Sequence, residues 1–275
     1  MVEVITYILF SIKYKYPQRR YGDIFLIIGG KKMNKNQWIK RISFDAIFAA
    51  LAVVLYCFGP KFKLATIFPS FLEINFSMVP IIILAFMLGP WDAALAVLVR
   101  MIIKFMVGTG TMGVGELADL LIGLLCCLPA GLIYHESKFK HKTLFAFISV
   151  VTMWVLGGVF TNIFINIPFY KAAFKMSDEA LAGMISAPIS TISFGLIKAD
   201  SITPANYMFY YIIFSIVPFN LMLGLAVTLV TAPIHLRLKS LYDMINIGHK
   251  KEEFDEKEFE LQEEKESVKN EKILN

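Results

Sequence analysis

Long apolar stretches separated by short polar connections dominate the sequence, and six of them approach the length of a membrane-spanning helix. Such a helix needs about 20 mostly apolar residues, and fewer where neighbouring helices cover it. The six predicted helices lie at 42–58, 78–88, 91–107, 117–134, 144–170 and 207–236. The second is short and meets the third at Gly89-Pro90, which predicts a tight hairpin. The predicted fold class is an all-α membrane protein, a compact bundle of six transmembrane helices.

The basic residues indicate how this bundle is oriented. With both termini on the cytoplasmic side, ten near-membrane Lys and Arg residues, within 31–41, 138–142 and 237–239, lie inside, against five outside. This distribution follows the positive-inside rule. The orientation places segments 59–77, 108–116 and 171–205 on the outer face.

Two of these outer segments are candidates for covering the bundle. Residues 71–77 alternate apolar and polar side chains and are too short to span, which predicts an extended strand or flap after the first helix. The connection 171–205, around Ser186-Ala187-Pro188, is either a lid or an ordered surface cap.

Composition supports the membrane assignment. The 275 residues are 57% apolar and 18% charged, with a mean hydropathy of +0.62, which excludes an ordinary cytosolic enzyme. The net charge of +5 is the sum of a basic body and an acidic tail. Residues 1–249 carry 21 basic and 12 acidic side chains, whereas residues 250–275 carry 6 basic and 10 acidic ones. The three cysteines all lie in apolar runs and predict buried side chains rather than disulfides, with palmitoylation of Cys126-Cys127 as the alternative.

These patterns divide the chain into three parts. Residues 33–248 form the membrane domain, and 249–275 form a charged cytoplasmic tail. Residues 1–32 are interpreted as a mis-assigned leader or a disordered N-terminus. Met33 is followed by basic residues that directly precede the first helix, as is usual for a translation start. In the segment before Met33 the positive charges follow the apolar run, whereas in a secretory signal they precede it.

The glycine-rich loop Gly108-Thr-Gly-Thr-Met-Gly-Val-Gly115 resembles a dinucleotide fingerprint in spelling but follows a membrane helix, not a strand. The sequence contains no Walker A motif, so we expect no ATPase activity. Glu116 and Asp119 follow the loop on one helix face, and intramembrane carboxylates require a partner or a function. An ion-pair cluster with Arg100 and Lys104 and contact with a ligand are equally good explanations.

Three intramembrane amides add to this polar set. Asn162 and Asn166 lie in the fifth helix and Asn220 in the sixth, close to Pro168 and Pro218. A single intramembrane Asn is explained by interhelical hydrogen bonding. Three of them beside carboxylates predict a polar pocket in an apolar wall, which is typical of a small-molecule site.

Ala46 and Ala50 place small residues four apart on the first helix, a spacing that allows close helix contact. They serve either packing within the bundle or docking of another membrane subunit. Catalysis is less well supported, because the sequence has no His-Glu-x-x-His motif and no serine beside an obvious base. We expect no metal, no resident cofactor and no nucleic-acid partner, and an intramembrane enzyme using Glu116 and Asp119 is the alternative class.

Several motifs together resemble a known family. They are Phe71-Leu-Glu-Ile-Asn-Phe-Ser-Met-Val-Pro80, Leu88-Gly-Pro90, Gly108 to Asp119 with its Gly-Val-Gly-Glu-Leu-Ala block, Leu128-Pro-Ala-Gly-Leu-Ile-Tyr134, Asn162 followed by Pro168-Phe-Tyr170, and Val217-Pro-Phe-Asn220. From about residue 42 to 241 the chain resembles the substrate-binding S components of energy-coupling factor (ECF) vitamin transporters, most closely the riboflavin-specific type.

The resemblance implies a six-helix, non-enzymatic subunit of the bacterial cell membrane that captures a vitamin outside. It would then join a transmembrane coupling subunit and two cytoplasmic ATPases, and topple to release the ligand. It implies ligand contacts at Asn162 and Asn220, a flap at 73–77 that closes over the ligand and includes Asn75 and Phe76, and a docking face at Ala46 and Ala50.

The ligand implied by the resemblance is riboflavin. The family usually has Asn at the position of Asp119 and Lys at the position of Leu223, and a missing buried donor costs about 1–3 kcal/mol. A related flavin such as FMN or roseoflavin, or another small vitamin or precursor, is therefore the alternative ligand.

Overall fold

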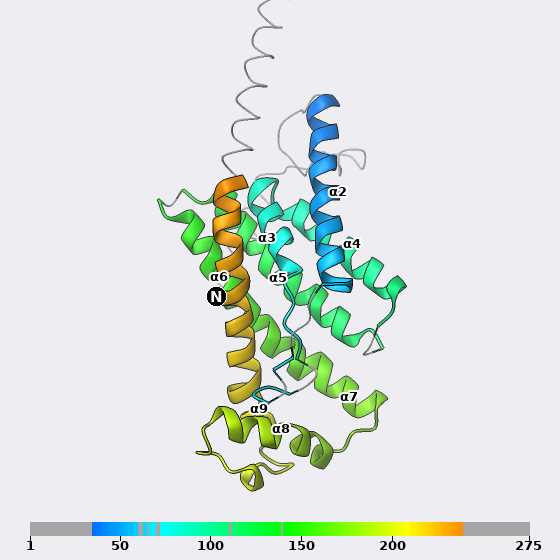
Figure 1. Ribbon diagram of the computed structural model, residues 1–275, viewed down its shortest axis with the longest axis vertical. Coiled ribbons are helices and arrows are strands. Elements are labelled where there is room, and N and C mark those ends of the chain that lie inside the picture. The colour runs from blue at the N-terminus through cyan, green and yellow to red at the C-terminus, as the bar shows by residue number, and fades with distance from the viewer. Residues whose placement is uncertain are drawn as a thin grey trace, which may run out of the picture.

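The computed structural model describes residues 35–238, except positions 60–62, 65, 70–71, 110–111 and 139, as a bundle of helices (Figure 1). The predicted leader, 1–32, and the charged tail, 249–275, lie outside the described residues. The helices are α2 (Lys35–Cys57), α3 (Met78–Met87), α4 (Pro90–Val107), α5 (Val114–Glu136), α6 (Lys142–Thr161), α7 (Ile167–Ala173), α8 (Asp178–Ile192) and α9 (Tyr207–Tyr211), with π turns η2 (Asn162–Asn166) and η4 (Ile212–Ile216) and a 3-10 turn η3 (Ala199–Ser201).

All six predicted helices are confirmed. The fifth runs unbroken from Lys142 to Ala173 through α6, η2 and α7, and the sixth runs from Tyr207 to Leu238 through α9 and η4. These two and α5 are long and apolar enough to cross a membrane. The 32 residues of each long helix extend about 48 Å, which exceeds the hydrocarbon core of about 30 Å.

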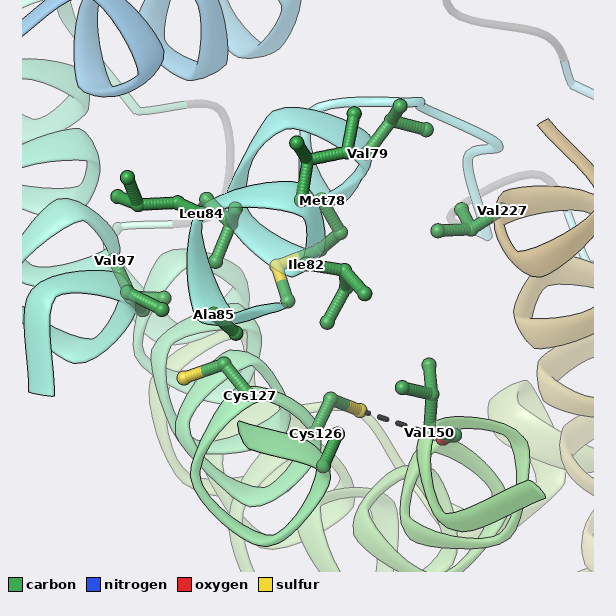
Figure 2. Close-up of a cluster of buried hydrophobic side chains, with 14 of the residues drawn as sticks. Met78, Val79, Ile82, Leu84, Ala85, Val97, Cys126, Cys127, Val150 and Val227 are labelled. Atoms are coloured by element: carbon green, nitrogen blue, oxygen red, sulfur yellow. Dashed lines mark hydrogen bonds between the residues drawn. The ribbon is translucent and has the colours of Figure 1, made fainter. Parts of the chain in front are cut away.

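The short helix α3 is the centre of the main core. All ten of its residues are buried, as expected for a helix that is apolar on every side. Figure 2 shows part of this core, where Ala85 of α3 lies near Cys127 of α5 and the Cys126 thiol donates to the carbonyl oxygen of Val150 at 3.7 Å. The predicted burial of Cys126 and Cys127 is therefore confirmed, and both thiols are free.

The predicted hairpin between α3 and α4 is also confirmed. Gly89 adopts φ +132°, a conformation that favours glycine, and Pro90 begins α4. Arg41 of α2 clamps this turn, because Nη2 donates to the carbonyl oxygen of Leu88 at 3.2 Å and Nε donates to Oδ1 of Asp92 at 3.1 Å. Arg41 and Asp92 form an ion pair that joins α2 to α4.

The connection 171–205 folds as an ordered helical cap around α8 and η3, not as an open loop (Figure 1). Ser177 caps α8 by accepting a hydrogen bond from the amide of Ala180 at 3.2 Å. Asp178 then accepts hydrogen bonds from Lys171 at 2.6 Å and from the Tyr207 hydroxyl at 2.8 Å. These bonds hold the pKa of Asp178 below its usual value and attach the cap to the ends of both long helices.

The flap segment is non-helical between Leu72 and Phe76, with a single β-bridge residue at Ile74. A full strand is not formed at these described positions. Leu72 packs against both buried apolar clusters, the one around α3 and the one formed by α8 with the adjoining ends of the long helices. The segment therefore lies between the bundle core and the cap.

Candidate binding site

Asn162 is buried at the start of the π turn η2 and makes three side-chain hydrogen bonds. Its Nδ2 donates to the carbonyl oxygen of Gly158 at 2.8 Å. Its Oδ1 accepts from the Tyr211 hydroxyl at 2.8 Å and from Nδ2 of Asn166 at 3.2 Å. These bonds join the two long helices through their polar side chains and hold the amide in one orientation.

Asn220, on the sixth helix, meets the same turn of α6. Its Nδ2 donates to the carbonyl oxygen of Ile216 at 2.8 Å, and its amide packs against Gly158. A Cβ on Gly158 would lie 2.4 Å from Cγ of Asn220, so only glycine leaves room for this amide. Asn162 and Asn220, 58 positions apart in sequence, thus converge on one residue.

The two carboxylates predicted from sequence lie at the start of α5. Glu116 is buried, and Asp119 is half-buried one turn further on. Asp119 is hydrogen-bonded to the Tyr56 side chain of α2. Glu116 is within electrostatic range of Tyr56 and of Tyr170 on α7. Tyr170 in turn lies within electrostatic range of Tyr211, whose hydroxyl donates to Asn162.

The predicted cationic partners of these carboxylates make other bonds. Arg100 is buried and donates from Nη1 to Oγ of Ser77 at 2.6 Å and from Nη2 to the backbone carbonyl of Asp119 at 3.4 Å. Its guanidinium carbon also lies 4.7 Å from the centre of the Tyr56 ring, a cation–π contact. Nζ of Lys104 donates to the carbonyl oxygen of Gly108 at 2.8 Å, which caps the end of α4.

Asn75 connects the flap to this network. Its Oδ1 accepts from the Ser77 hydroxyl at 2.7 Å and from the Ser77 amide at 3.3 Å. Because Arg100 donates to the same hydroxyl, Asn75 and Arg100 are joined through one side chain. Phe76 packs against the core around α3. Hydrogen bonds therefore join Asn75, Arg100 and the backbone of Asp119 into one polar region in an apolar bundle.

Ala46 and Ala50 lie apart from this region, exposed on the outer surface of α2. Ile47, Leu51 and Val54 extend the same exposed apolar surface. Leu223, one turn after Asn220, is 5% exposed and belongs to the apolar core.

Three residues of the site were not predicted from sequence: Tyr56, Gly158 and Tyr211. Only Tyr211 carried a usable signal, because it stands two positions before an Ile-Phe motif that recurs with the same Pro-Phe ending near Asn162. The roles of Tyr56 and Gly158 depend on how the helices pack against one another.

Comparison with known proteins decides the family. The model of the ECF transporter substrate-specific component matches residues 40–235, which is most of the chain. This chain belongs to the substrate-specific (S) components of ECF transporters. It is therefore a membrane protein of a transport system, as its three long apolar helices independently indicate.

Two individual proteins are similar to this S component. The riboflavin transporter RibU of Staphylococcus aureus (strain TCH60) is 26% identical over 219 residues, which cover 79% of this chain and 99% of RibU. A solved structure described as the S component of a bacterial ECF transporter superposes with a TM-score of 0.51 at 22% identity. The superposition covers 74% of this chain and 98% of the other, and it confirms the fold of the bundle.

Proposed function

We propose that this S component captures riboflavin at the outer face of the bacterial cell membrane for uptake. The observation that carries the proposal is the convergence of the buried amides of Asn162 and Asn220 on Gly158. Hydrogen-bonding groups placed in an apolar wall orient a small ligand that has both a hydrophobic body and polar edges. The similarity to RibU, a riboflavin transporter, favours riboflavin as that ligand.

In this proposal the polar network has two tasks. Asn162, Asn220, Glu116 and Asp119 contact the ligand's polar groups. Asn75 and Phe76 close the outer side, and the Ser77 hydroxyl ties this flap to the bundle through Arg100.

The side chain of Leu223 is the reason to keep related ligands as the alternative to riboflavin. Its apolar side chain lies in the core one turn from Asn220, so the position supplies no hydrogen bond to a ligand. A related flavin such as FMN or roseoflavin, or another small vitamin or precursor, would then bind at the same residues. Competition against bound riboflavin ranks these candidates directly.

Release of the ligand depends on other subunits. We place Ala46 and Ala50 in the docking face for a transmembrane coupling subunit, because their small exposed side chains allow another helix to approach closely. Two cytoplasmic ATPases energise the assembly. The topology that fits this arrangement has six spans and both termini in the cytoplasm, which places the α8 cap outside, and the chain itself performs no chemical step on its ligand.

Binding is tested with purified protein by quenching of riboflavin fluorescence. Asn162→Ala and Asn220→Ala should each weaken binding about tenfold or more, because each removes hydrogen bonds worth about 1–3 kcal/mol when buried. Ser186→Ala, on the exposed side of α8, is the control and should bind as the wild type does. Unchanged binding in both Asn variants would refute these site assignments.

The docking face needs a different assay. Ala46→Leu and Ala50→Leu should leave riboflavin binding intact and abolish uptake by the assembled transporter. Leu51→Ala, on the same exposed surface but without added bulk, serves as the control. Normal uptake with both leucine variants would exclude this face as the docking surface.

A further inference from the structure

The two long helices carry the same irregularity at corresponding positions. Residues 163–169 read Ile-Phe-Ile-Asn-Ile-Pro-Phe, and residues 213–219 read Ile-Phe-Ser-Ile-Val-Pro-Phe. Each segment overlaps a five-residue π turn, and each turn ends two residues before the proline. The amide of Ile167 bonds to the carbonyl of Asn162, and the amide of Val217 bonds to the carbonyl of Ile212, five residues earlier in both cases.

The prolines account for these turns. Pro168 and Pro218 have no N–H to donate, and their rings clash with the carbonyl four residues earlier in a regular α-helix. Widening the preceding turn to a five-residue hydrogen bond avoids the clash and keeps the helix continuous. The extra residue in each turn also changes which side chains face the neighbouring helix.

The side chains that meet between the two π turns are Asn162 and Tyr211. Asn162 is the first residue of η2, and Tyr211 immediately precedes η4. Tyr211 is 1% exposed, and its hydroxyl donates to Oδ1 of Asn162 at 2.8 Å. This bond joins the two irregular turns of the long helices.

The Tyr211 bond limits what the Asn162 amide can offer a ligand. An amide oxygen has two acceptor sites and an amide nitrogen has two N–H groups. The hydroxyl of Tyr211 and Nδ2 of Asn166 occupy both acceptor sites, and one N–H is donated to the carbonyl oxygen of Gly158. One N–H is left over, so the hydrogen-bonding group that Asn162 can still offer a ligand is a donor.

We propose that Tyr211 is a positioning residue that fixes the orientation of the Asn162 amide, so that Asn162 presents an N–H to a hydrogen-bond acceptor of the ligand. The inference rests on the proposed function for its ligand. Without the Tyr211 hydroxyl, the amide oxygen keeps only the bond from Nδ2 of Asn166 at 3.2 Å, so the amide plane is held less firmly. The remaining N–H would then be aimed less accurately at the ligand.

The test is a double-mutant cycle with riboflavin as the probe. Tyr211→Phe removes only the hydroxyl and should weaken riboflavin binding about tenfold, in line with the loss of one buried hydrogen bond. Tyr211→Phe combined with Asn162→Ala should bind no more weakly than Asn162→Ala alone, because Tyr211 acts through Asn162. Additive losses, or wild-type binding by Tyr211→Phe, would overturn the inference.

Tyr210→Phe is the matched control. The Tyr210 ring packs against Phe209 and Phe214, and its hydroxyl forms no hydrogen bond within the described part of the chain. This variant should bind riboflavin as the wild type does. If Tyr210→Phe loses as much riboflavin affinity as Tyr211→Phe, removal of either hydroxyl disturbs the helix itself. That result would contradict the positioning role of Tyr211.

A ligand-free measurement separates this inference from the proposed function. In protein labelled with ¹⁵N-asparagine, the side-chain NH₂ resonances of Asn162 should shift in Tyr211→Phe and stay in place in Tyr210→Phe. If the Asn162 resonances shift in Tyr211→Phe but the wild type does not bind riboflavin, the proposed ligand is wrong and the positioning role of Tyr211 stands. Unmoved Asn162 resonances would overturn the positioning, whatever the ligand.

Discussion

Gly158 is the position where a single methyl group tests the geometry of the site most sharply. A Cβ built there lies 2.4 Å from Cγ and Nδ2 of Asn220 and 2.6 Å from Oδ1, against 3.4–4 Å for ordinary contacts. Gly158→Ala therefore requires the Asn220 amide to move by about 1 Å. This shift breaks or strains the 2.8 Å bond from Nδ2 to the carbonyl oxygen of Ile216.

The expected magnitude follows from that bond. Losing a buried hydrogen bond costs about 1–3 kcal/mol, whereas Ala stabilises a helix interior by about 1 kcal/mol relative to Gly. The net destabilisation is therefore about 0–2 kcal/mol, which lowers the melting temperature by a few degrees at most. Riboflavin affinity should fall about tenfold to a hundredfold, because the displaced amide no longer meets the ligand.

Riboflavin titration and a thermal melt of the same sample measure the two effects. Gly183→Ala in α8 is the control, because a Cβ there meets nothing within 4 Å, and it should keep full affinity. Wild-type affinity in Gly158→Ala would refute the placement of Asn220 in the binding site.

Three further predictions concern stability and pH. Gly131→Ala places a Cβ 2.9 Å from Cα of Pro90, a backbone atom in a tight turn, and should destabilise the fold by about 1–3 kcal/mol in thermal unfolding. Asp92→Ala leaves the Arg41 guanidinium without its carboxylate and should lower the melting temperature more than the paired replacement Arg41→Met with Asp92→Leu; equal losses would contradict the clamp. Because the pKa of Asp178 is lowered, its contacts stabilise the fold above the usual carboxyl pKa of about 4 and are lost as the pH falls through the folded-state pKa. The difference in melting temperature between wild type and Asp178→Asn should therefore shrink below about pH 4, and a constant difference would exclude this titration.

The helices were predictable because their signals are local. An apolar run of sufficient length, or a Gly-Pro pair such as Gly89-Pro90, specifies a helix or a turn without reference to the rest of the chain. Local signals did not decide whether the connection 171–205 is a lid or an ordered surface cap. Its α8 helix begins at an ordinary cap, Ser177, but attachment to the bundle depends on Asp178 meeting Tyr207, 29 residues later.

The candidate site was predictable as a set of residues and not as a set of contacts. Burial cost alone draws attention to Glu116 and Asn162, since polar groups are expensive inside an apolar bundle. Which groups pair depends on the rotation of each helix, and in the two long helices a π turn changes that rotation. Arg100 on α4 donates to Ser77 and to a backbone carbonyl, whereas an ion pair with the acidic residues of α5 was one of the two explanations open from sequence.

The most direct test of the account is native mass spectrometry of the purified S component after incubation with micromolar riboflavin. One added mass equal to that of unaltered riboflavin is expected, retained by the wild type and lost from Asn220→Ala. No added mass, or equal retention by both proteins, would contradict the claim that this chain captures riboflavin at the site formed by Asn162, Asn220 and Gly158.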